Sequence, residues 1–209
     1  MRRYDKGMKN PLIVGVTGAS GSILASKTVD ALLELNIPTV LVASNPARMV
    51  WQLEMSETFG ESLERWAENP GFSHHAIGDL QAPIASGTYP SRGMVIVPGS
   101  MATVSAIVNG ISDNLIRRAA DVCLKEKRPF VIVPRESPLN RIHLSNLAAL
   151  DSFGISIVTA DPPYYLPIKT LEDSATFTAQ RVLLALNIIK ELPEEFRYEW
   201  SYIPHMFRV

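Results

Sequence analysis

Short apolar runs alternate with longer amphipathic segments along this chain. The runs lie near 12–17, 38–43, 93–98, 130–134 and 155–158, and each carries few charges. Strands that lack polar alternation are covered on both faces, as in a parallel sheet. Helical patterns fall near 21–35, 46–57, 100–109, 113–127, 140–151 and 171–190. The alternation predicts a doubly wound α/β fold with a parallel sheet, whose ligands bind at the carboxyl ends of the strands.

Two stretches fall outside this regular pattern. The region 60–92 is rich in glycine and proline, and we expect it to hold a short strand near 73–77 and a long ligand-side loop. Residues 191–209 are polar and aromatic, and because exposed aromatic rings are costly we expect them to pack on a neighbouring subunit. No repeat or linker divides the rest. We therefore predict a loose leader over 1–10 and a single domain over 11–190.

Composition narrows the classes of function. The chain has 209 residues, of which 46% are hydrophobic and 20% charged, as in an ordinary globular protein. A net charge of −1 gives no electrostatic case for nucleic acid or for an anionic membrane surface. No apolar run reaches membrane-spanning length, and none of signal-peptide length follows Arg2 and Arg3. The single cysteine, Cys123, fits a reducing compartment, so we expect a cytoplasmic location.

A glycine-rich turn follows the first apolar run. The chain reads Leu-Ile-Val-Gly-Val-Thr-Gly-Ala-Ser-Gly from Leu12 to Gly21, and a helical pattern begins at Ser22. Glycines let a backbone pass close to an anion, while the amides of a helix start point at it. The turn predicts a phosphorylated ligand at the end of the first strand. A tight strand-to-helix turn without a ligand is the alternative.

The phosphorylated ligand could be a nicotinamide dinucleotide or a mononucleotide. Residues 17–20 resemble the start of a dehydrogenase fingerprint, and Tyr165 and Lys169 have Tyr-x-x-x-Lys spacing. However, the later glycines of that fingerprint are absent, the second strand ends without an acid for a ribose, and Pro167 prevents the Tyr–Lys pair from sharing a helix face. A mononucleotide such as FMN fits better because it needs only one phosphate site.

Serines stand at the ends of two further strands. Ser44 lies just before Pro46, which suits a first helical position, and Ser100 opens the helix predicted at 100–109. Each serine could serve only as a helix cap, which is its usual role there, or could also meet a ligand. Together with the first turn, they predict three strand ends that offer donors on one edge of the sheet.

Basic residues predict a second anion site. Arg118 and Lys125 share one stripe of their predicted helix, although a solvated face with local ion pairs also explains this spacing. Arg135 and Glu136 follow a strand directly, at the end where ligands bind, and Arg181 is a cation in an otherwise apolar helix, where a charge needs a partner. These cations exceed what one flavin phosphate requires, so we infer a phosphorylated substrate.

The order of these motifs resembles that of the flavin prenyltransferases, the UbiX-type partners of decarboxylases that use prenylated flavin. The matching segments are 18–21, 86–87, 98–101, 114–121, 124–126, 134–138 and 163–165. The likeness runs in order from about Leu12 to Ile189. The Arg-Glu-x-Pro and Leu-Lys-Glu blocks are its specific part, because many folds share the glycine turn.

The resemblance implies a reaction and an assembly. It implies a flavodoxin-like or Rossmann-like sheet, FMN at a site between subunits, and a homo-oligomer that is often a dodecamer. The implied enzyme moves a dimethylallyl group from dimethylallyl monophosphate to N5 of reduced FMN and closes a ring at C6, without a metal. The product, prenylated FMN, would serve a UbiD-type decarboxylase as downstream partner.

The resemblance also implies roles for individual residues. FMN would be held by Gly18, Ala19, Ser20, Ser44, Ser100, Met101, Ala102, Thr103 and Arg135. The substrate phosphate would be surrounded by Ser86, Arg118, Lys125, Glu136, Tyr165 and Arg181. The catalytic residues would be Ser20, Glu54, Lys125 and Glu136, with Ser20 and Glu54 sharing the proton transfer. Fixed cations stabilise the charge that develops on a leaving phosphate oxygen.

Three departures from the family pattern concern the pocket wall. Leu24, Asn45 and Leu80 stand where tyrosine, lysine and tryptophan occur in other members, which affects the prenyl donor more than FMN binding. The residues leave open an FMN-dependent decarboxylase of cysteinyl peptides and a non-catalytic flavin-binding protein. Neither alternative needs the basic residues, so these favour the prenyltransferase. The four histidines show no metal-ligand spacing.

Overall fold

The apolar runs form six parallel strands. In the computed structural model, which describes residues 10–198, they are β1 (Leu12–Val16), β2 (Thr39–Ala43), β3 (Phe72–Ala76), β4 (Gly93–Gly99), β5 (Phe130–Pro134) and β6 (Ser156–Ile157). β1, β2 and β4 are buried along their whole length, as expected for strands without polar alternation. Each strand lies within one residue of its predicted bounds.

The strands are ordered β3-β2-β1-β4-β5-β6. β1 pairs in parallel with both β2 and β4, so the chain winds outward from β1 in both directions. This is the strand order of doubly wound Rossmann-like folds, which bind ligands where the order reverses, at the carboxyl ends of the strands. The predicted fold class is confirmed, and the crevice between β1 and β4 is the expected ligand position.

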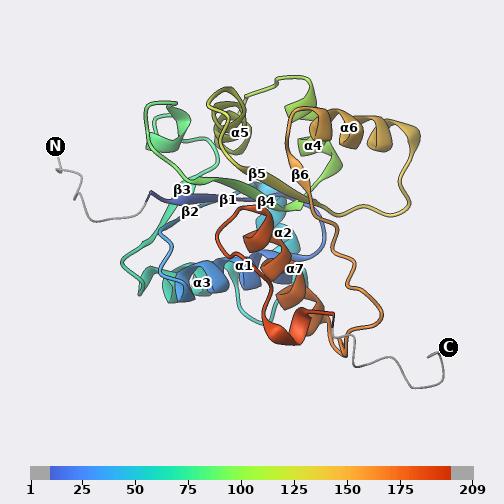
Figure 1. Cartoon of the computed structure of the whole chain (residues 1–209). Coiled ribbons are helices and arrows are strands. Elements are labelled where there is room, and N and C mark those ends of the chain that lie inside the picture. Colours follow the sequence, from blue (N-terminus) through green and yellow to red (C-terminus); the bar gives the residue numbers. More distant parts are fainter. Residues whose placement is uncertain (1–9, 199–209) are drawn as a thin grey trace, which may run out of the picture.

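Seven α-helices cover the two faces of the sheet. They are α1 (Ser22–Glu34), α2 (Asn45–Glu54), α3 (Phe59–Ala67), α4 (Met101–Val108), α5 (Leu115–Lys125), α6 (Arg141–Ser152) and α7 (Leu171–Ala185), with short 3₁₀ turns η1 (Pro83–Ala85) and η2 (Glu194–Phe196), all within the described residues. One apolar core joins the sheet to α1, α2, α3 and α7, and a second joins it to α4, α5 and α6 (Figure 1).

Two helices differ most from the predicted pattern, and a third, α2, ends at Glu54 although it was predicted to reach residue 57. The pattern missed α3, which begins at a capping box between Thr58 and Glu61 and buries Phe59 and Trp66. The second residue of α3 is a glycine, which has a low helix propensity and therefore argued against a helix here. The last helix was predicted to reach residue 190, but α7 ends at Ala185 because Asn187 adopts a positive φ of 55° that stops the helix.

The described part of the aromatic tail packs on its own chain. The ring of Phe196 lies 5.5 Å from that of Phe177 on α7, and the ring of Tyr198 lies 5.4 Å from that of Tyr165. These two rings therefore pack within the chain, and the packing of the tail on a neighbouring subunit stays a prediction. Most of the predicted leader, and the tail beyond residue 198, lie outside the described residues. Between residues 10 and 198, none of the helices is both long and apolar enough for a membrane span.

Candidate functional site

A pocket of about 430 Å³ opens where the strand order reverses. It is lined by Thr17, Gly18, Ser44, Asn45, Pro46, Ile77, Ser100, Ala102, Thr103, Asn114, Ile116 and Arg117. We call it the cofactor pocket, because five of these residues are among those expected to hold FMN. Its volume lies in the range typical of small-molecule sites. Segments that follow β1, β2, β3 and β4 therefore meet at one edge of the sheet, and those after β1, β2 and β4 are the three that the sequence predicted.

The two serines of the cofactor pocket cap helices. The Ser44 Oγ accepts a hydrogen bond from the backbone of Ala47 at 3.2 Å, at the start of α2. The Ser100 Oγ accepts one from the backbone of Thr103 at 3.3 Å, at the start of α4. A hydroxyl that accepts a bond can still donate its own proton, and the Ser100 Oγ also shares a hydrogen bond of 3.0 Å with the Thr103 Oγ1, in which either oxygen can be the donor. The capping role and a role in ligand binding are therefore compatible at both positions.

Thr17 holds the cofactor pocket together and was missed from the sequence. Its side chain is only 3% exposed, and its Oγ1 donates to the carbonyl of Pro98 at 2.8 Å. The same oxygen accepts from the backbone of Ser100 at 2.7 Å. The end of β1 is thereby tied to the turn between β4 and α4. The motif Thr-Gly-Ala-Ser contained this residue, but a bond over 83 positions has no local signal.

Gly18 is required by packing as well as by any ligand. A Cβ at this position would lie 2.3 Å from the Cβ of Pro46, closer than atoms of this kind approach. The absent side chain lets the turn after β1 rest directly on the start of α2. The glycine therefore shapes the pocket wall, whatever binds there.

The amides at the end of the glycine-rich turn bind a carboxylate of the same chain, that of Glu54. Gly21 is the N-cap of α1 and offers no side chain to the first amides of the helix. Instead, the backbone amides of Gly21 and Ser22 donate to the Glu54 Oε2 at 2.9 and 2.8 Å. The prediction that these amides await a ligand phosphate is therefore corrected. The carboxylate takes the place at the positive helix end that a phosphate would occupy.

Ser20 and Glu54, the pair expected to transfer a proton, lie together. Burial raises the pKa of Glu54, but hydrogen bonds from the Ser20 side chain and from the Ser22 and Gly21 amides together outweigh burial, and the pKa lies below its ordinary value. Glu54 is therefore ionised near neutral pH. In this state it accepts protons and cannot donate one.

The predicted basic residues do not all gather in one chain, although Arg118 and Lys125 both lie beside the turn at residues 85–87. Arg118 donates from Nε to the carbonyl of Ala85 at 3.0 Å and from Nη1 to Asp121 at 2.7 Å. The local ion pair, one of the two explanations for this stripe, is therefore real. Lys125 is the last residue of α5 and lies 3.5 Å from Glu126. Because α5 starts at the cofactor pocket and has 11 residues, Lys125 is displaced from that end by about 15 Å along the helix.

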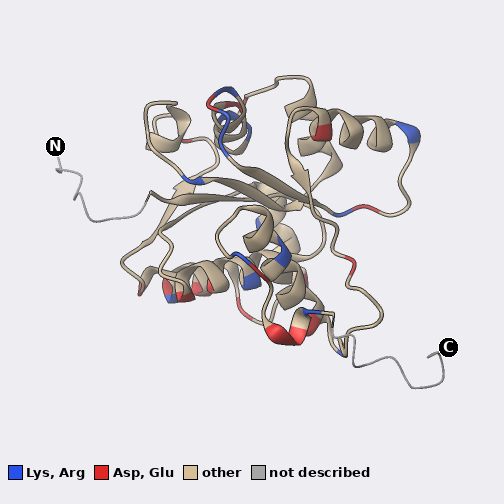
Figure 2. Ribbon diagram, viewed as in Figure 1, with Lys and Arg blue, Asp and Glu red and all other residues tan. Residues whose placement is uncertain are grey.

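Other residues expected at the substrate phosphate are exposed. Arg181 is exposed on α7 and has no hydrogen bond or ion pair among residues 10–198, so these residues do not supply the partner expected for it. Tyr165 is 64% exposed, and the Ser86 hydroxyl bonds only Thr88 within the described chain. Lys and Arg residues lie on α5, after β5 and on α7, on different sides of the sheet (Figure 2).

Arg135 and Glu136 lie where the sequence placed them, directly after β5. The backbone of Arg135 donates to the carbonyl of Gly99 at 3.1 Å, which brings Arg135 beside the turn that carries Ser100. Its Nε is buried and has no hydrogen-bond partner within residues 10–198. Ala19 and Met101, also expected at FMN, are each 7% exposed. Arg135 thus has an unused donor near the cofactor pocket.

Cys123 is a structural residue, as expected from the apolar stripe of its helix. It is fully buried in the core beneath α5, and burial raises the pKa of its thiol to about 12. Such a thiol remains protonated and inert at neutral pH. In the part of the chain that the structure describes, no three His, Cys, Asp or Glu side chains gather as metal ligands.

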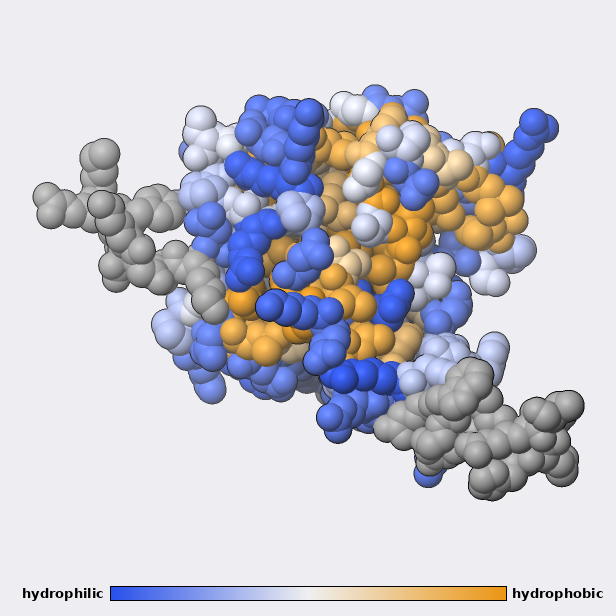
Figure 3. Space-filling view, in the orientation of Figure 1, coloured by the Kyte–Doolittle hydropathy of each residue, from blue (hydrophilic) through white to orange (hydrophobic). Residues whose placement is uncertain are grey.

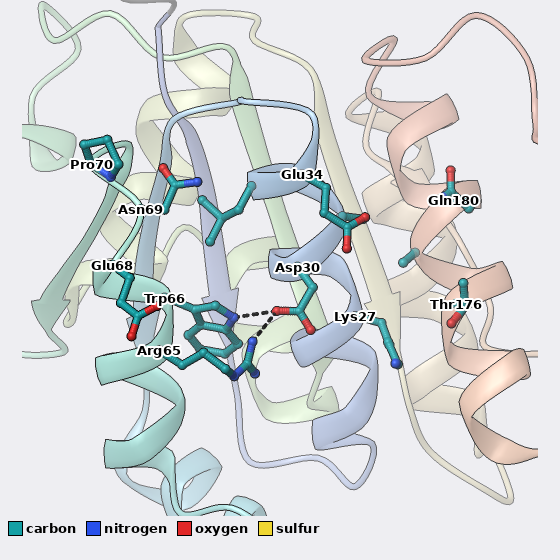
Figure 4. A pocket seen from close by; sticks show the side chains of 13 residues that line it. Lys27, Asp30, Glu34, Arg65, Trp66, Glu68, Asn69, Pro70, Thr176 and Gln180 are labelled. Atoms are coloured by element: carbon teal, nitrogen blue, oxygen red, sulfur yellow. Dashed lines mark hydrogen bonds and ion pairs between the residues drawn. The ribbon is translucent and has the colours of Figure 1, made fainter.

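A larger pocket, of about 750 Å³, lies between α1, α3 and α7 (Figure 4). Part of its polar lining is already paired, since Asp30 accepts from Arg65 at 2.8 Å and from the Trp66 indole at 2.7 Å. None of the residues predicted at the site lines this pocket. It is a groove between surface helices, so the smaller cofactor pocket is the candidate site.

Known proteins resemble this chain over most of its length. The model of the flavoprotein family matches residues 2–183. The flavin prenyltransferase UbiX of Synechocystis sp. is 42% identical over 191 residues, which cover 87% of this chain and 93% of the relative. Among solved structures, the dodecameric FMN-dependent UbiX-like decarboxylase from Escherichia coli O157:H7 has a TM-score of 0.83 and 37% identity, covering 90% of this chain and 99% of the other. AnUbiX (PadA1), in complex with FMN and dimethylallyl pyrophosphate, has a TM-score of 0.83 and 34% identity, covering 91% and 97%.

Proposed function

The chain belongs to the UbiX flavin prenyltransferase family, and from this membership we propose that it transfers a dimethylallyl group from dimethylallyl monophosphate to N5 and C6 of reduced FMN. The observation that carries the proposal is the cofactor pocket. It brings Gly18, Ser44, Ser100, Ala102 and Thr103 to the edge of the sheet where doubly wound folds bind nucleotides.

The residues present fit FMN. Ser44 and Ser100 offer hydroxyls at the starts of two helices, whose positive ends favour a phosphate. The buried Nε of Arg135 has no partner in the described chain, and a flavin oxygen would supply one. When bound, FMN supplies the nucleophilic ring atoms of the reaction. The chain itself supplies the binding, the orientation and the proton transfer.

Glu54 and Ser20 are the proposed proton acceptors. The two amides at the start of α1 hold the Glu54 carboxylate in place and keep it ionised. A positioned carboxylate can remove the ring proton that carbon–carbon bond formation releases. The Ser20 hydroxyl, bonded to this carboxylate, would relay the proton.

The substrate phosphate is proposed to bind between subunits of a homo-oligomer, a dodecamer as in the E. coli relative. Lys125 lies too far along α5 to reach the cofactor pocket of its own chain, so a neighbouring copy would supply it. Arg118, Tyr165, Arg181, Glu136 and Ser86 would complete this second half. Apolar side chains exposed around α6 support assembly, among them Ile142 at 69% and Leu144 at 55% (Figure 3).

The setting of the enzyme is also a proposal. Fixed arginines and lysines can neutralise a leaving phosphate, so no metal is required in the proposed reaction. The reduced, buried Cys123 supports a cytoplasmic location. The product, prenylated FMN, is proposed to pass to a UbiD-type decarboxylase.

The test is an anaerobic incubation with reduced FMN and dimethylallyl monophosphate, followed by mass spectrometry of the flavin. The proposal predicts a flavin heavier by one prenyl unit. A parallel incubation with dimethylallyl pyrophosphate shows which donor this chain prefers, since a relative was crystallised with that compound. Unmodified FMN with both donors would contradict the proposal.

A further inference from the structure

The cofactor pocket has one charged side chain in its wall. Of the residues between 10 and 198 that line it, Arg117 alone carries a formal charge, and the others are polar or apolar. Arg117 lies in the first turn of α5, and its backbone amide is already bonded to the Asn114 side chain at 3.1 Å. Any contribution to ligand binding therefore comes from its guanidinium.

Protein partners orient the Arg117 guanidinium but do not use all of its hydrogen-bond donors. Its Nη1 donates to both carboxylate oxygens of Asp113, at 2.8 and 2.9 Å. Its Nε is buried, and within the described residues it has no hydrogen-bond partner. A buried donor without an acceptor is costly, and a ligand oxygen would remove this cost. Asp113 is 57% exposed, so solvent weakens its neutralisation of the arginine.

Three helix starts surround the same pocket. The N-caps of α2, α4 and α5 are Ser44, Ser100 and Asn114, and all three line it. Each helix start carries a partial positive charge, so the three add to the charge of Arg117. By contrast, the start of α1 is already neutralised by Glu54. The pocket therefore favours the most anionic part of its ligand.

We propose that Arg117 binds the phosphate group of FMN in the cofactor pocket. Arginine suits this role because its planar guanidinium offers several donors to phosphate oxygens. Asp113 is the positioning residue, since it holds one end of the guanidinium and leaves Nε available. The proposal rests on the proposed function, which supplies FMN as the ligand.

Titration of the flavin-free full-length protein tests this role, with binding measured by flavin fluorescence. FMN and riboflavin are compared because they share the ring and differ in the phosphate. Arg117→Met should weaken FMN binding roughly 10- to 100-fold, the range for a bond to a charged group, and leave riboflavin binding unchanged. Arg117→Lys should recover part of the loss. Arg141→Met, which removes the same charge from an exposed position, should change neither ligand.

Two results would overturn the proposal. Equal FMN affinity of the wild type and Arg117→Met would remove Arg117 from binding, and an equal loss for both ligands would assign it to the flavin ring. Thermal melting of the flavin-free variants shows whether they fold, and Arg117→Lys carries the comparison if the methionine variant does not. If the wild type binds no FMN, the proposed function fails, which is distinct from failure at Arg117 alone.

Discussion

The cofactor pocket and the basic residues expected at the substrate phosphate differ in how far one chain builds them. Ser44 and Ser100 are held at their places by helix capping, and Thr17 ties two strand ends together beside them. Arg118, Lys125 and Arg181 lie instead on the outer surfaces of helices on opposite sides of the sheet. A doubly wound fold gathers helix starts at one edge of its sheet, whereas it has no comparable means of gathering surface cations.

This difference indicates that the basic residues, more than the cofactor pocket, depend on assembly of several copies. The cofactor pocket uses backbone features that the fold requires in any case, so a single chain can present it. In the proposed function, the basic residues gain a common target when surfaces of several copies meet. Binding of FMN and turnover should therefore respond to different substitutions.

Lys125→Ala should have the largest effect, and it should separate prenyl transfer from FMN binding. We expect prenyl transfer to fall by about 100-fold or more, because a fixed cation no longer stabilises the leaving phosphate. FMN binding should stay unchanged, since Lys125 lies at the far end of α5 from the cofactor pocket. Single-turnover formation of prenylated flavin and FMN titration measure the two effects. Lys190→Ala, at an exposed lysine, is the matched control, and loss of FMN from Lys125→Ala would place Lys125 at the cofactor instead.

Oligomers that contain two different variants test whether the FMN-binding and phosphate-binding halves of the site come from different copies of the chain. Glu54→Gln removes the proposed proton acceptor at the start of α1, and Lys125→Ala removes a cation that a neighbour would provide. If the two halves come from different copies, co-assembly of the two inactive variants should restore a clear fraction of the wild-type rate. Native mass spectrometry verifies that mixed assemblies form. Mixed assemblies without activity would mean that one chain supplies both halves.

Much of the fold follows from local patterns in the sequence. Apolar runs such as Leu12–Val16 define a buried strand whichever partners it has. Serines before helices, such as Ser44 and Ser100, follow capping rules that act over three or four residues. Accordingly, five of the nine residues expected to hold FMN line the cofactor pocket, and their role in binding stays a prediction. The helix α3 was missed although its capping box, Thr-x-x-Glu, was present as a signal.

The remaining features depend on contacts between distant residues. The carboxylate of Glu54 accepts from the amide of Gly21, 33 positions away, and no sequence pattern near Glu54 predicts that bond. The helical stripe of Arg118 and Lys125 was recognised, but its orientation relative to the pocket follows only from the direction of α5. Arg117 was overlooked because its neighbour Arg118 matched the family pattern. The role of Arg117 rests on a pocket that only the folded chain forms.

Ser100→Ala tests how far the cofactor pocket serves stability. Loss of the N-cap of α4 should cost about 1 kcal/mol in the free energy of unfolding, measured by urea denaturation of the flavin-free protein. The bond from the Ser100 backbone amide to the Thr17 Oγ1 remains, so the turn should keep its shape. FMN affinity should fall as well if the hydroxyl also meets the ligand. A stability loss with unchanged FMN affinity would reduce Ser100 to a helix cap.

Glu54→Gln should have the smallest effect on stability, and its pH dependence identifies the cause. The folded pKa of Glu54 lies below its ordinary value of 4.5, so its contribution is present above that pH and is lost as the pH falls through the lowered pKa. At about pH 7 the variant should lose roughly 0.5 kcal/mol, because an uncharged amide interacts less well with a helix start. The difference should shrink in acid, where the wild-type carboxyl is protonated. Urea denaturation of the wild type and the variant, at pH 7 and at a pH below the lowered pKa of Glu54, measures this difference in the free energy of unfolding. A loss that does not change with pH would mean that packing, and not charge, holds Glu54 at α1, and the carboxylate would then lose its support as the proton acceptor of the cofactor half.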